Sequence, residues 1–308
     1  MKPEHSSTGA LFALFTVVVW GAQLPIAKVA MAAIDGYTIS LVRYALAVAG
    51  LLPVLAWREG AASVSMGEQR WLAIAAGVLG MGASAVLCFV GLAMTRPETA
   101  VIIISLQPAM TAIGDWILRG RRPAGFTLAC LAAAFIGVLT AVTRGGSALG
   151  ELADSTAREL LGDALVFLGA VAWVSYALMS ERFRGWSSLR ISALTCTTAL
   201  AGLLVTWLLA LLAGAAQVPT AGALVEHGWR LAFLGLLGVL AAMFLWNAGI
   251  RRIGALNAML ILSLMPVITF SYRAFEGATF APSELAGAAL VVGALIANNL
   301  YLRRRAGT

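Results

Sequence analysis

The sequence has few charged residues and almost no histidine. Only 11% of its 308 residues are charged, and the two histidines lie at positions 5 and 227. A soluble domain carries about 25% charged residues, so this composition cannot cover a water-facing surface. It excludes soluble enzymes, nucleic-acid binders and disordered scaffolds. The sequence also has no clustered Asp/Glu motif and no GxxxxGK phosphate loop, so it gives little support to a catalytic centre or a bound cofactor.

Cysteine is equally scarce. The three cysteines, Cys88, Cys130 and Cys196, all fall within apolar segments. That placement is typical of small side chains in a hydrophobic core. Neither a disulfide framework nor a CxxC metal site is indicated, and we expect no bound metal.

Long apolar runs make up most of the chain. Hydrophobic residues account for 61% of it, and a membrane-spanning helix needs about 20 of them in succession. The first run is too long for a signal peptide, whose apolar core has about 7–15 residues. The sequence therefore predicts an all-α polytopic membrane protein with ten transmembrane helices, at residues 9–32, 38–57, 71–94, 98–118, 125–143, 161–181, 190–214, 229–250, 255–274 and 284–302.

Lysine and arginine are distributed unevenly between the ends of these spans. With the N-terminus inside the cell, fourteen of them fall at inner ends and five at outer ends. An excess of positive residues marks the cytoplasmic side. We therefore expect a multi-pass protein of the inner (plasma) membrane with both termini in the cytoplasm.

Two patterns recur along the chain in the same order. Residues Trp20, Gln23 and Ala27 correspond to Trp173, Tyr176 and Ser180 at an offset of 153. The segment 105–108 (Ser-Leu-Gln-Pro) corresponds to 263–266 (Ser-Leu-Met-Pro) at an offset of 158. Each repeat holds five spans, and an odd number places adjacent repeats in opposite orientations. We expect two inverted five-helix repeats, at residues 1–145 and 161–308, joined by an external loop at residues 146–160.

Two segments resemble a known family. Residues 20–28 read WGAQLPIAK, and residues 245–250 read LWNAGI and are followed by Gly254-Ala255. Both are similar to signatures of the EamA family, in the drug/metabolite transporter superfamily. The resemblance covers nearly the whole chain. It implies a ten-helix carrier made of two EamA-like domains, from a family that includes exporters of amino acids and related metabolites.

The repeat and the helical period select candidate substrate-binding residues. Trp20 and Gln23 share one helical face, and so do Trp173 and Tyr176. The two pairs form either ordinary core packing or opposite walls of a cavity near the membrane midplane. Four more side chains within the spans are candidates for substrate contact: Lys28, Gln107, Trp246 and Asn247.

Prolines and charges inside the spans leave alternatives open. Pro108 and Pro266 either kink packing helices or break helices that line the site. Lys28 and Arg43 lie near outer ends, where a long side chain reaches the headgroups by snorkelling; alternatively they pair with Asp35 or contact a substrate carboxylate. Two shallow acids either carry a proton during transport or serve helix ends, namely Asp115 and Asp163.

The leading hypothesis is a secondary transporter. It would export a small neutral or zwitterionic metabolite, with amino acids as leading candidates, by alternating access between the repeats. No carboxylate lies at mid-span, which disfavours cationic substrates. A channel or a lipid-handling protein is the alternative, and a membrane enzyme is more remote. The expected partners are the substrate and membrane lipid, and the sequence leaves the coupling ion and the oligomeric state undetermined.

Overall fold

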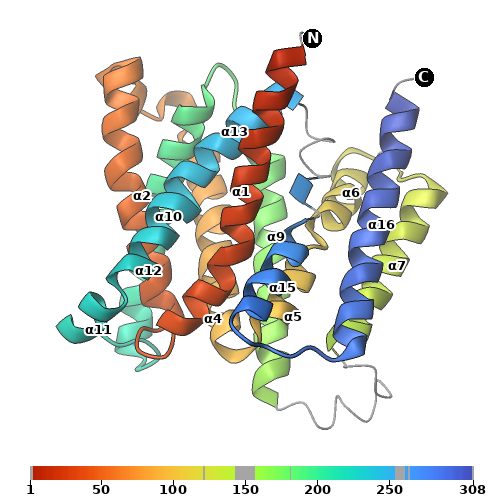
Figure 1. Cartoon of the computed structure of the whole chain (residues 1–308). Helices are drawn as coiled ribbons and strands as arrows, with labels where there is room; N and C mark the ends of the chain where they lie inside the picture. Colours follow the sequence, from red (N-terminus) through yellow and green to blue (C-terminus); the bar gives the residue numbers. More distant parts are fainter. Residues whose placement is uncertain are drawn as a thin grey trace.

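The computed structural model describes residues 3–120, 122–142, 157–180, 182–253, 261–262 and 264–306. Within these ranges every element is a helix (Figure 1). Six helical segments are long and apolar enough to cross a membrane: Ser7–Ala30, Gly36–Glu59, Ala61–Met94, Ala157–Ser180, Ser188–Leu212 and Gly228–Gly249. Two shorter apolar helices accompany them, Gly125–Ala141 and Pro282–Asn298. The predicted all-α membrane architecture is thereby supported, whereas the count of ten spans stays a prediction.

The first half of the chain contains several long helices and two short 3₁₀ turns. Its elements are α1 (Pro3–Ala30), α2 (Gly36–Glu59), η1 (Ala61–Val64), η2 (Gly67–Gln69), α3 (Arg70–Ala75), η3 (Ala76–Gly82), α4 (Ala83–Met94), α5 (Pro97–Ile104), α6 (Gln107–Arg119) and α7 (Gly125–Val142). Helices α3, η3 and α4 form one continuous rod. The predicted span 98–118 is not one helix, because α5 and α6 are separated by a turn at residues 105–106.

The second half repeats this order. Its elements are α9 (Ala157–Ser180), α10 (Ser188–Leu212), α11 (Ala221–Glu226), α12 (Gly228–Ala232), η4 (Phe233–Ala241), α13 (Ala242–Ile253), α15 (Met265–Phe275) and α16 (Pro282–Ala306). Helices α12, η4 and α13 form the second continuous rod. The first part of the predicted span 255–274 lies outside the described residues, as does most of the predicted external loop.

The rods share an unusual feature at matched positions. Both η3 and η4 are π-helical segments, and their first residues are 157 positions apart. Each contains a Gly-x-x-Gly pair, Gly77/Gly80 and Gly235/Gly238, at an offset of 158. Segments of π-helix are rare in proteins and occur frequently at functional sites.

The two halves pack against each other with exchanged partners. Helix α4 packs on α9 and α13 packs on α1, while α2 packs on α10 and α7 on α16. In Figure 1, α1 runs away from the end where both termini lie, and α9 runs back toward it. The arrangement is that of two similar halves related by an approximate two-fold axis.

Close glycine contacts reproduce this symmetry at the atomic level. A Cβ on Gly91 would lie 2.6 Å from the carbonyl oxygen of Gly162, and one on Gly162 would lie 2.8 Å from that of Gly91. In the symmetry-related contact, Gly249 takes the place of Gly91 and Gly9 takes the place of Gly162. A Cβ on Gly249 would lie 3.1 Å from the Gly9 carbonyl oxygen. The same helix–helix contact is therefore built twice.

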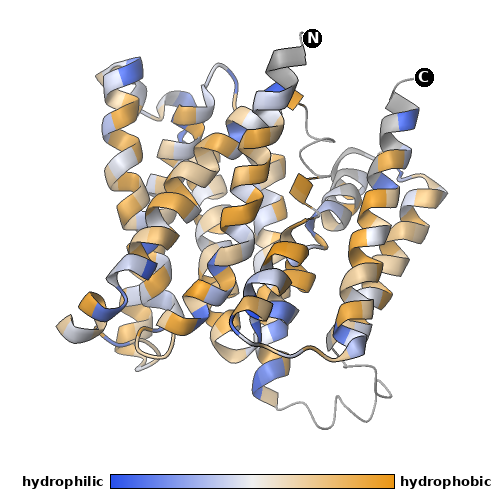
Figure 2. Ribbon diagram, viewed as in Figure 1, coloured by the Kyte–Doolittle hydropathy of each residue, from blue (hydrophilic) through white to orange (hydrophobic). Residues whose placement is uncertain are grey.

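The outer surface of the bundle is apolar. Leu209 of α10 is 61% exposed, and Phe135 and Ile136 of α7 are more than half exposed. Figure 2 shows hydrophobic residues along the middle of the helices and most strongly hydrophilic ones toward the two ends. Such a band suits lipid rather than water.

Candidate functional site

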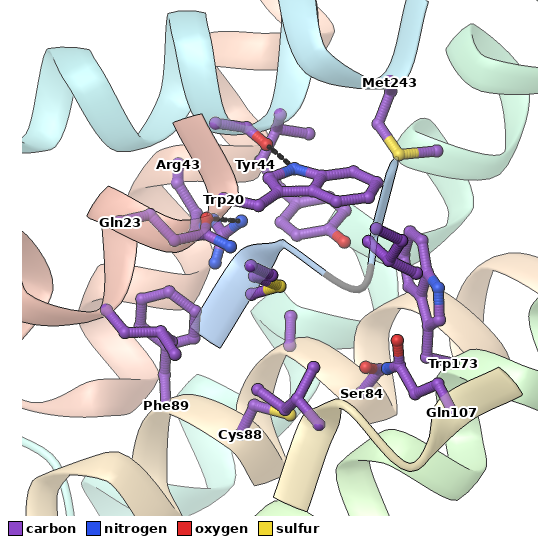
Figure 3. A pocket seen from close by; sticks show the side chains of 17 residues that line it. Trp20, Gln23, Arg43, Tyr44, Ser84, Cys88, Phe89, Gln107, Trp173 and Met243 are labelled. Atoms are coloured by element: carbon purple, nitrogen blue, oxygen red, sulfur yellow. Dashed lines mark hydrogen bonds between the residues drawn. The ribbon is translucent and has the colours of Figure 1, made fainter. Parts of the chain in front are cut away.

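A cavity lies between the two halves of the bundle. It offers about 90 Å³ to the centres of water molecules, enough room for several waters. Its walls come from seven of the predicted spans, four in the first half of the chain and three in the second. The lining residues are Trp20, Gln23, Leu24, Arg43, Tyr44, Ser84, Ala85, Cys88, Phe89, Ile104, Gln107, Trp173, Gly238, Val239, Met243, Leu262 and Met265 (Figure 3).

Trp20 forms the centre of an aromatic cluster at this cavity. Its indole Nε1 donates a hydrogen bond of 3.0 Å to the carbonyl oxygen of Gly238, within the π-helical η4. Its ring lies 5.8 Å from that of Trp173 in an edge-to-face arrangement at 85°. The matched tryptophans of the two repeats therefore meet in the interior and do not face lipid.

Gln23 lies one turn from Trp20 and holds a charged partner. Its side-chain oxygen accepts a hydrogen bond of 3.2 Å from Nη2 of Arg43 on α2. The Arg43 guanidinium lies 4.3 Å from the centre of the Phe89 ring and 5.8 Å from that of Tyr44. Cation–π contacts of this kind contribute about 0.5–2 kcal/mol.

Arg43 corrects one expectation from the sequence. The side chain is only 6% exposed and points into the cavity, so the snorkelling interpretation is wrong for it. Pairing with Asp35 is also wrong, because Asp35 caps α2 and accepts hydrogen bonds from Thr38 and from the backbone N–H of Gln217. A long basic side chain snorkels only where its helix face is open to lipid, and this face packs inward.

The predicted site residues divide into those at the cavity and those beside it. Trp20, Gln23, Gln107 and Trp173 line it. Tyr176 lies behind Trp173, with ring centres 5.2 Å apart. A Cβ on Gly80 would lie 2.6 Å from the Tyr176 Cβ, so the tyrosine packs directly on η3.

Three other candidates have partners outside the cavity lining. Trp246 is buried with its ring 5.4 Å from that of Trp20. Asn247 donates a hydrogen bond of 2.9 Å to the hydroxyl of Ser192 on α10. The Lys28 ammonium donates to the carbonyl oxygens of Leu92, Ala93 and Thr95, at 2.7, 3.1 and 2.7 Å. It therefore caps the C-terminus of α4, where a cation complements the helix dipole.

Both prolines stand at helix starts. Pro108 lies in the first turn of α6, directly after the turn that separates α5 from α6, and Pro266 lies in the first turn of α15. Proline suits a first turn because it has no N–H to leave unpaired. Residues Gln107 and Met265, which precede the two prolines, both line the cavity. Of the matched serines, Ser263 lies outside the described residues.

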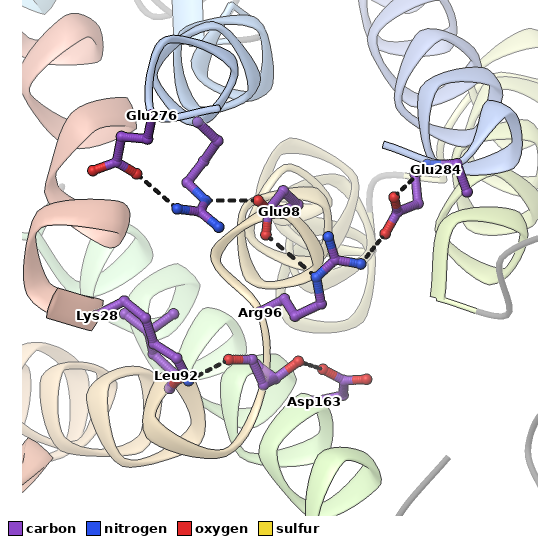
Figure 4. Close-up of polar contacts among 10 residues, drawn as sticks. Lys28, Leu92, Arg96, Glu98, Asp163, Glu276 and Glu284 are labelled. Atoms are coloured by element: carbon purple, nitrogen blue, oxygen red, sulfur yellow. Dashed lines mark hydrogen bonds and ion pairs between the residues drawn. The ribbon is translucent and has the colours of Figure 1, made fainter. Parts of the chain in front are cut away.

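A network of ion pairs, drawn in Figure 4, lies where α5 and α16 begin, at the end of the bundle opposite the termini in Figure 1. We call it the Glu98 cluster; it comprises Arg96, Glu98, Arg273, Glu276 and Glu284. Arg273 bonds Glu98 at 2.8 Å and Glu276 at 2.7 Å, while Arg96 bonds Glu284 and lies 3.7 Å from Glu98. The cluster joins α5 to α15 and α16. Glu98, at 1% exposure, is its buried centre.

The two shallow acids differ in what is known of them. Asp163 on α9 accepts a hydrogen bond from the Thr95 hydroxyl, beside the Glu98 cluster. The side chain of Asp115 lies outside the described ones. Among described residues, no group of three His, Cys, Asp or Glu is placed to hold a metal ion.

Sequence reasoning left one feature of the cavity open and missed another. Contact with a substrate carboxylate is one of the alternatives that the sequence leaves for Arg43, an intramembrane charge, but Arg43 is not among the predicted substrate-binding residues. The Gly-x-x-Gly pairs of η3 and η4 are a repeat signal as clear as the tryptophans, because they recur at the same offset as the proline segment.

Known proteins resemble this chain over its whole length. The "Uncharacterized transporter YrdR" of Bacillus subtilis (strain 168) is 29% identical over 311 aligned positions, covering 99% of this chain and 95% of the relative. The "Uncharacterized transporter YyaM" of the same organism is 28% identical over 294 positions, covering 94% and 92%. A solved structure described as "Crystal structure of protein" has a TM-score of 0.68 at 20% identity and covers 97% of this chain and 99% of its own. It shares the fold.

The family model settles the resemblance. The EamA-like transporter family matches residues 7–143 and again residues 160–300. The two matches follow the two halves whose packing is described above, and together they span most of the chain. The relatives are transporters by name and none is named as an enzyme. The predicted resemblance is confirmed, and this multi-span membrane protein belongs to the EamA-like transporter family.

Proposed function

We propose that the chain is a secondary transporter that exports small metabolites across the inner membrane by alternating access. One observation carries the proposal: a cavity with aromatic and polar walls lies where the two repeats meet, and both repeats line it. Inverted repeats commonly hold the substrate at such an interface and rock around it. Amino acids are candidate substrates because the family resemblance includes their exporters.

The small size of the cavity supports alternating access over an open pore. A metabolite fits a space of about 300–1,000 Å³, whereas this one holds only several waters. The halves therefore have to separate for a substrate to enter. In this proposal the Glu98 cluster is the contact that breaks when the cavity opens outward, and ten spans in two inverted repeats, with boundaries near residues 145 and 161, supply the moving halves.

The proposed binding residues follow from the same site. Trp20 and Trp173 would cover the apolar part of the substrate, with Gln23 and Gln107 for its polar groups. Tyr176 and Trp246 would hold the two tryptophans in place. Lys28 and Asn247 would contribute to substrate binding from outside the cavity lining. Pro108 and Pro266 would position the starts of α6 and α15 beside the cavity.

Counterflow in proteoliposomes tests the transporter. Vesicles loaded with an unlabelled amino acid or organic acid should take up the labelled compound transiently and saturably if the protein is a carrier. Trp57→Ala, which changes an 80% exposed tryptophan far from the cavity, is the control variant. Flux without saturation or counterflow would favour a channel, and the absence of any flux across the panel would count against transport.

The proposed orientation has its own test. A cysteine at Gln217, exposed between α10 and α11, should react with an impermeant thiol reagent added outside the cell. One at Glu68, exposed in η2, should react only after the membrane is opened. The three native cysteines are first replaced by alanine. The opposite labelling pattern would reverse the topology and place both termini outside.

A further inference from the structure

We infer that Arg43 is the receptor for a carboxylate on the transported substrate, and that Gln23 holds its guanidinium while the site awaits one. The inference rests on the proposed transport function and names the substrate class of that same site. The class is a small organic acid with one carboxylate and an apolar or aromatic body.

The positive charge of Arg43 is costly in its buried position. Arg43 is 6% exposed and its Nε is buried without a hydrogen-bond partner. Among the described residues, its guanidinium donates one hydrogen bond, to the neutral Gln23. A buried charge is stable only when it is paired and its donors are satisfied. The Phe89 ring is a partial substitute for a counter-ion, and it leaves donors of a five-donor group unused.

No described residue supplies Arg43 with a counter-ion. None of the described residues that line the cavity is an aspartate or a glutamate, and Arg43 takes part in none of the ion pairs between described residues. The contrast with Arg96 and Arg273 is direct, because each of these pairs with glutamates of the Glu98 cluster. Within the part of the chain that the structure describes, these two partly exposed arginines therefore have carboxylate partners, whereas the buried Arg43 has none.

The cavity gives a ligand access to the Arg43 guanidinium. Arg43 borders the cavity, so a ligand there reaches the guanidinium without any rearrangement of α2. Figure 3 shows Arg43 and Gln23 together on one side and Trp173 with Gln107 on the other, with Trp20 between them. Arginine binds a carboxylate through two parallel hydrogen bonds. A carboxylate at Arg43 would therefore place the rest of the molecule against the tryptophans.

The single positive charge of Arg43 limits the charge that the ligand can carry. One guanidinium neutralises one carboxylate, so a dicarboxylate or a phosphate dianion would leave a negative charge buried in the cavity. An ammonium group would find neutral oxygens and aromatic faces there, and no described acid. A monocarboxylate with a ring is the best match to these walls.

Binding to the purified protein in detergent tests the inference without any transport step. Phenylacetate and phenylacetamide differ only in the charged group, and thermal stabilisation or calorimetry gives their affinities. We expect the wild type to bind phenylacetate about tenfold or more tightly than the amide, and Arg43→Gln to lose that preference. Arg58→Gln, the same change at the exposed end of the same helix, should keep it.

A second variant protects the test against misfolding. Gln23→Glu places a carboxylate beside Arg43, so it should occupy the guanidinium and weaken phenylacetate binding about tenfold or more in a protein that still unfolds cooperatively. Equal binding of acid and amide by the wild type, or unchanged phenylacetate binding in Gln23→Glu, would overturn the inference. Counterflow by a wild type that does not distinguish acid from amide would refute the carboxylate receptor alone and leave the transporter standing.

Discussion

At the scale of single residues, the cavity combines tightly packed tryptophans with an arginine that has no carboxylate partner among the described residues. Trp20 is fixed by a hydrogen bond to the π-helical segment and by two neighbouring indoles. Trp173 is half-buried and has one face toward the cavity. Arg43 lies among them, and its hydrogen-bond partner among the described residues is a neutral acceptor, Gln23. The rigid rings suit recognition of shape, and the arginine suits recognition of charge.

Truncation of Trp173 should reduce substrate binding and leave the fold intact. The indole lines the cavity, so its removal deletes a wall against which an apolar group would pack. We expect Trp173→Ala to weaken binding by about 1–3 kcal/mol with unchanged abundance in the membrane. Transport assays beside the exposed control Trp57→Ala measure this. Normal counterflow in Trp173→Ala would reduce this side chain to core packing.

Replacement of Arg43 by methionine should not destabilise the ligand-free protein. An apolar side chain of similar size in place of a poorly compensated buried charge is often neutral or stabilising by about 1–4 kcal/mol. Thermal unfolding in detergent should therefore give a Tm for Arg43→Met equal to or above that of the wild type. A fall of several degrees, with no change in Arg58→Met, would mean that the arginine is a structural strut.

Sequence reasoning reaches some of these residues and not others for physical reasons. Trp20 and Trp173 are predictable because the repeat and the helical period place both at one interface. Tyr176 shares a face with Trp173, yet it packs behind it because Gly80 leaves room for its backbone and Cβ. Arg43 is near a helix end in sequence, and only the packing of α2 decides that its side chain turns inward.

At the scale of helices, glycine residues determine which pairs of helices pack most closely. Gly91 on α4 and Gly162 on α9 bring two backbones into contact, and Gly137 on α7 meets Gly287 on α16 in the same way. Small residues at such crossings are the general means by which membrane helices approach. The apolar runs predict the helices well, but π turns and the break between α5 and α6 depend on tertiary contacts that no run of hydropathy encodes.

A methyl group at one of these crossings should be costly. In Gly91→Ala the new Cβ would meet the Gly162 carbonyl oxygen at 2.6 Å, so the helices must shift. We expect a loss of about 1–3 kcal/mol in stability, read as a lowered Tm. Gly125→Ala, at the start of α7, meets nothing within 4 Å and should be neutral or mildly stabilising. Equal melting of the two variants would contradict the close crossing.

At the scale of the whole molecule, two similar halves enclose the cavity, and among the described residues the Glu98 cluster joins them by ion pairs at the end opposite the termini. Helices α5, α15 and α16 meet through Glu98, which is almost fully buried between Arg96 and Arg273. Arg96 and Arg273 are partly exposed, at 32% and 29%, so solvent weakens their ion pairs, but loss of either arginine would leave the buried Glu98 carboxylate with fewer partners. The cluster therefore contributes to holding the two halves together at this end.

Loss of the Glu98 charge should open the cavity toward that end. Native Cys88 lines the cavity and serves as the reporter. In a background without Cys130 and Cys196, Glu98→Gln should raise the rate at which an external, impermeant thiol reagent modifies Cys88. The exposed Glu68→Gln is the matched control. An unchanged rate would show that the ion pairs stabilise the fold without governing access.

The Glu98 cluster also has a kinetic consequence, because its counterpart is missing from the other repeat. At the 158-residue offset, the sequence has Leu256 where the first repeat has Glu98, and Asp115 where the second has Arg273. In the proposed carrier, the cluster would stabilise one facing over the other, so the two facings would have unequal energies. A site that faces one compartment for only a fraction of the time has an apparent dissociation constant raised by that fraction. Half-saturation would then differ between the two sides of the membrane, while the ratio of maximal rate to half-saturation stays equal in both directions whenever no gradient drives the cycle.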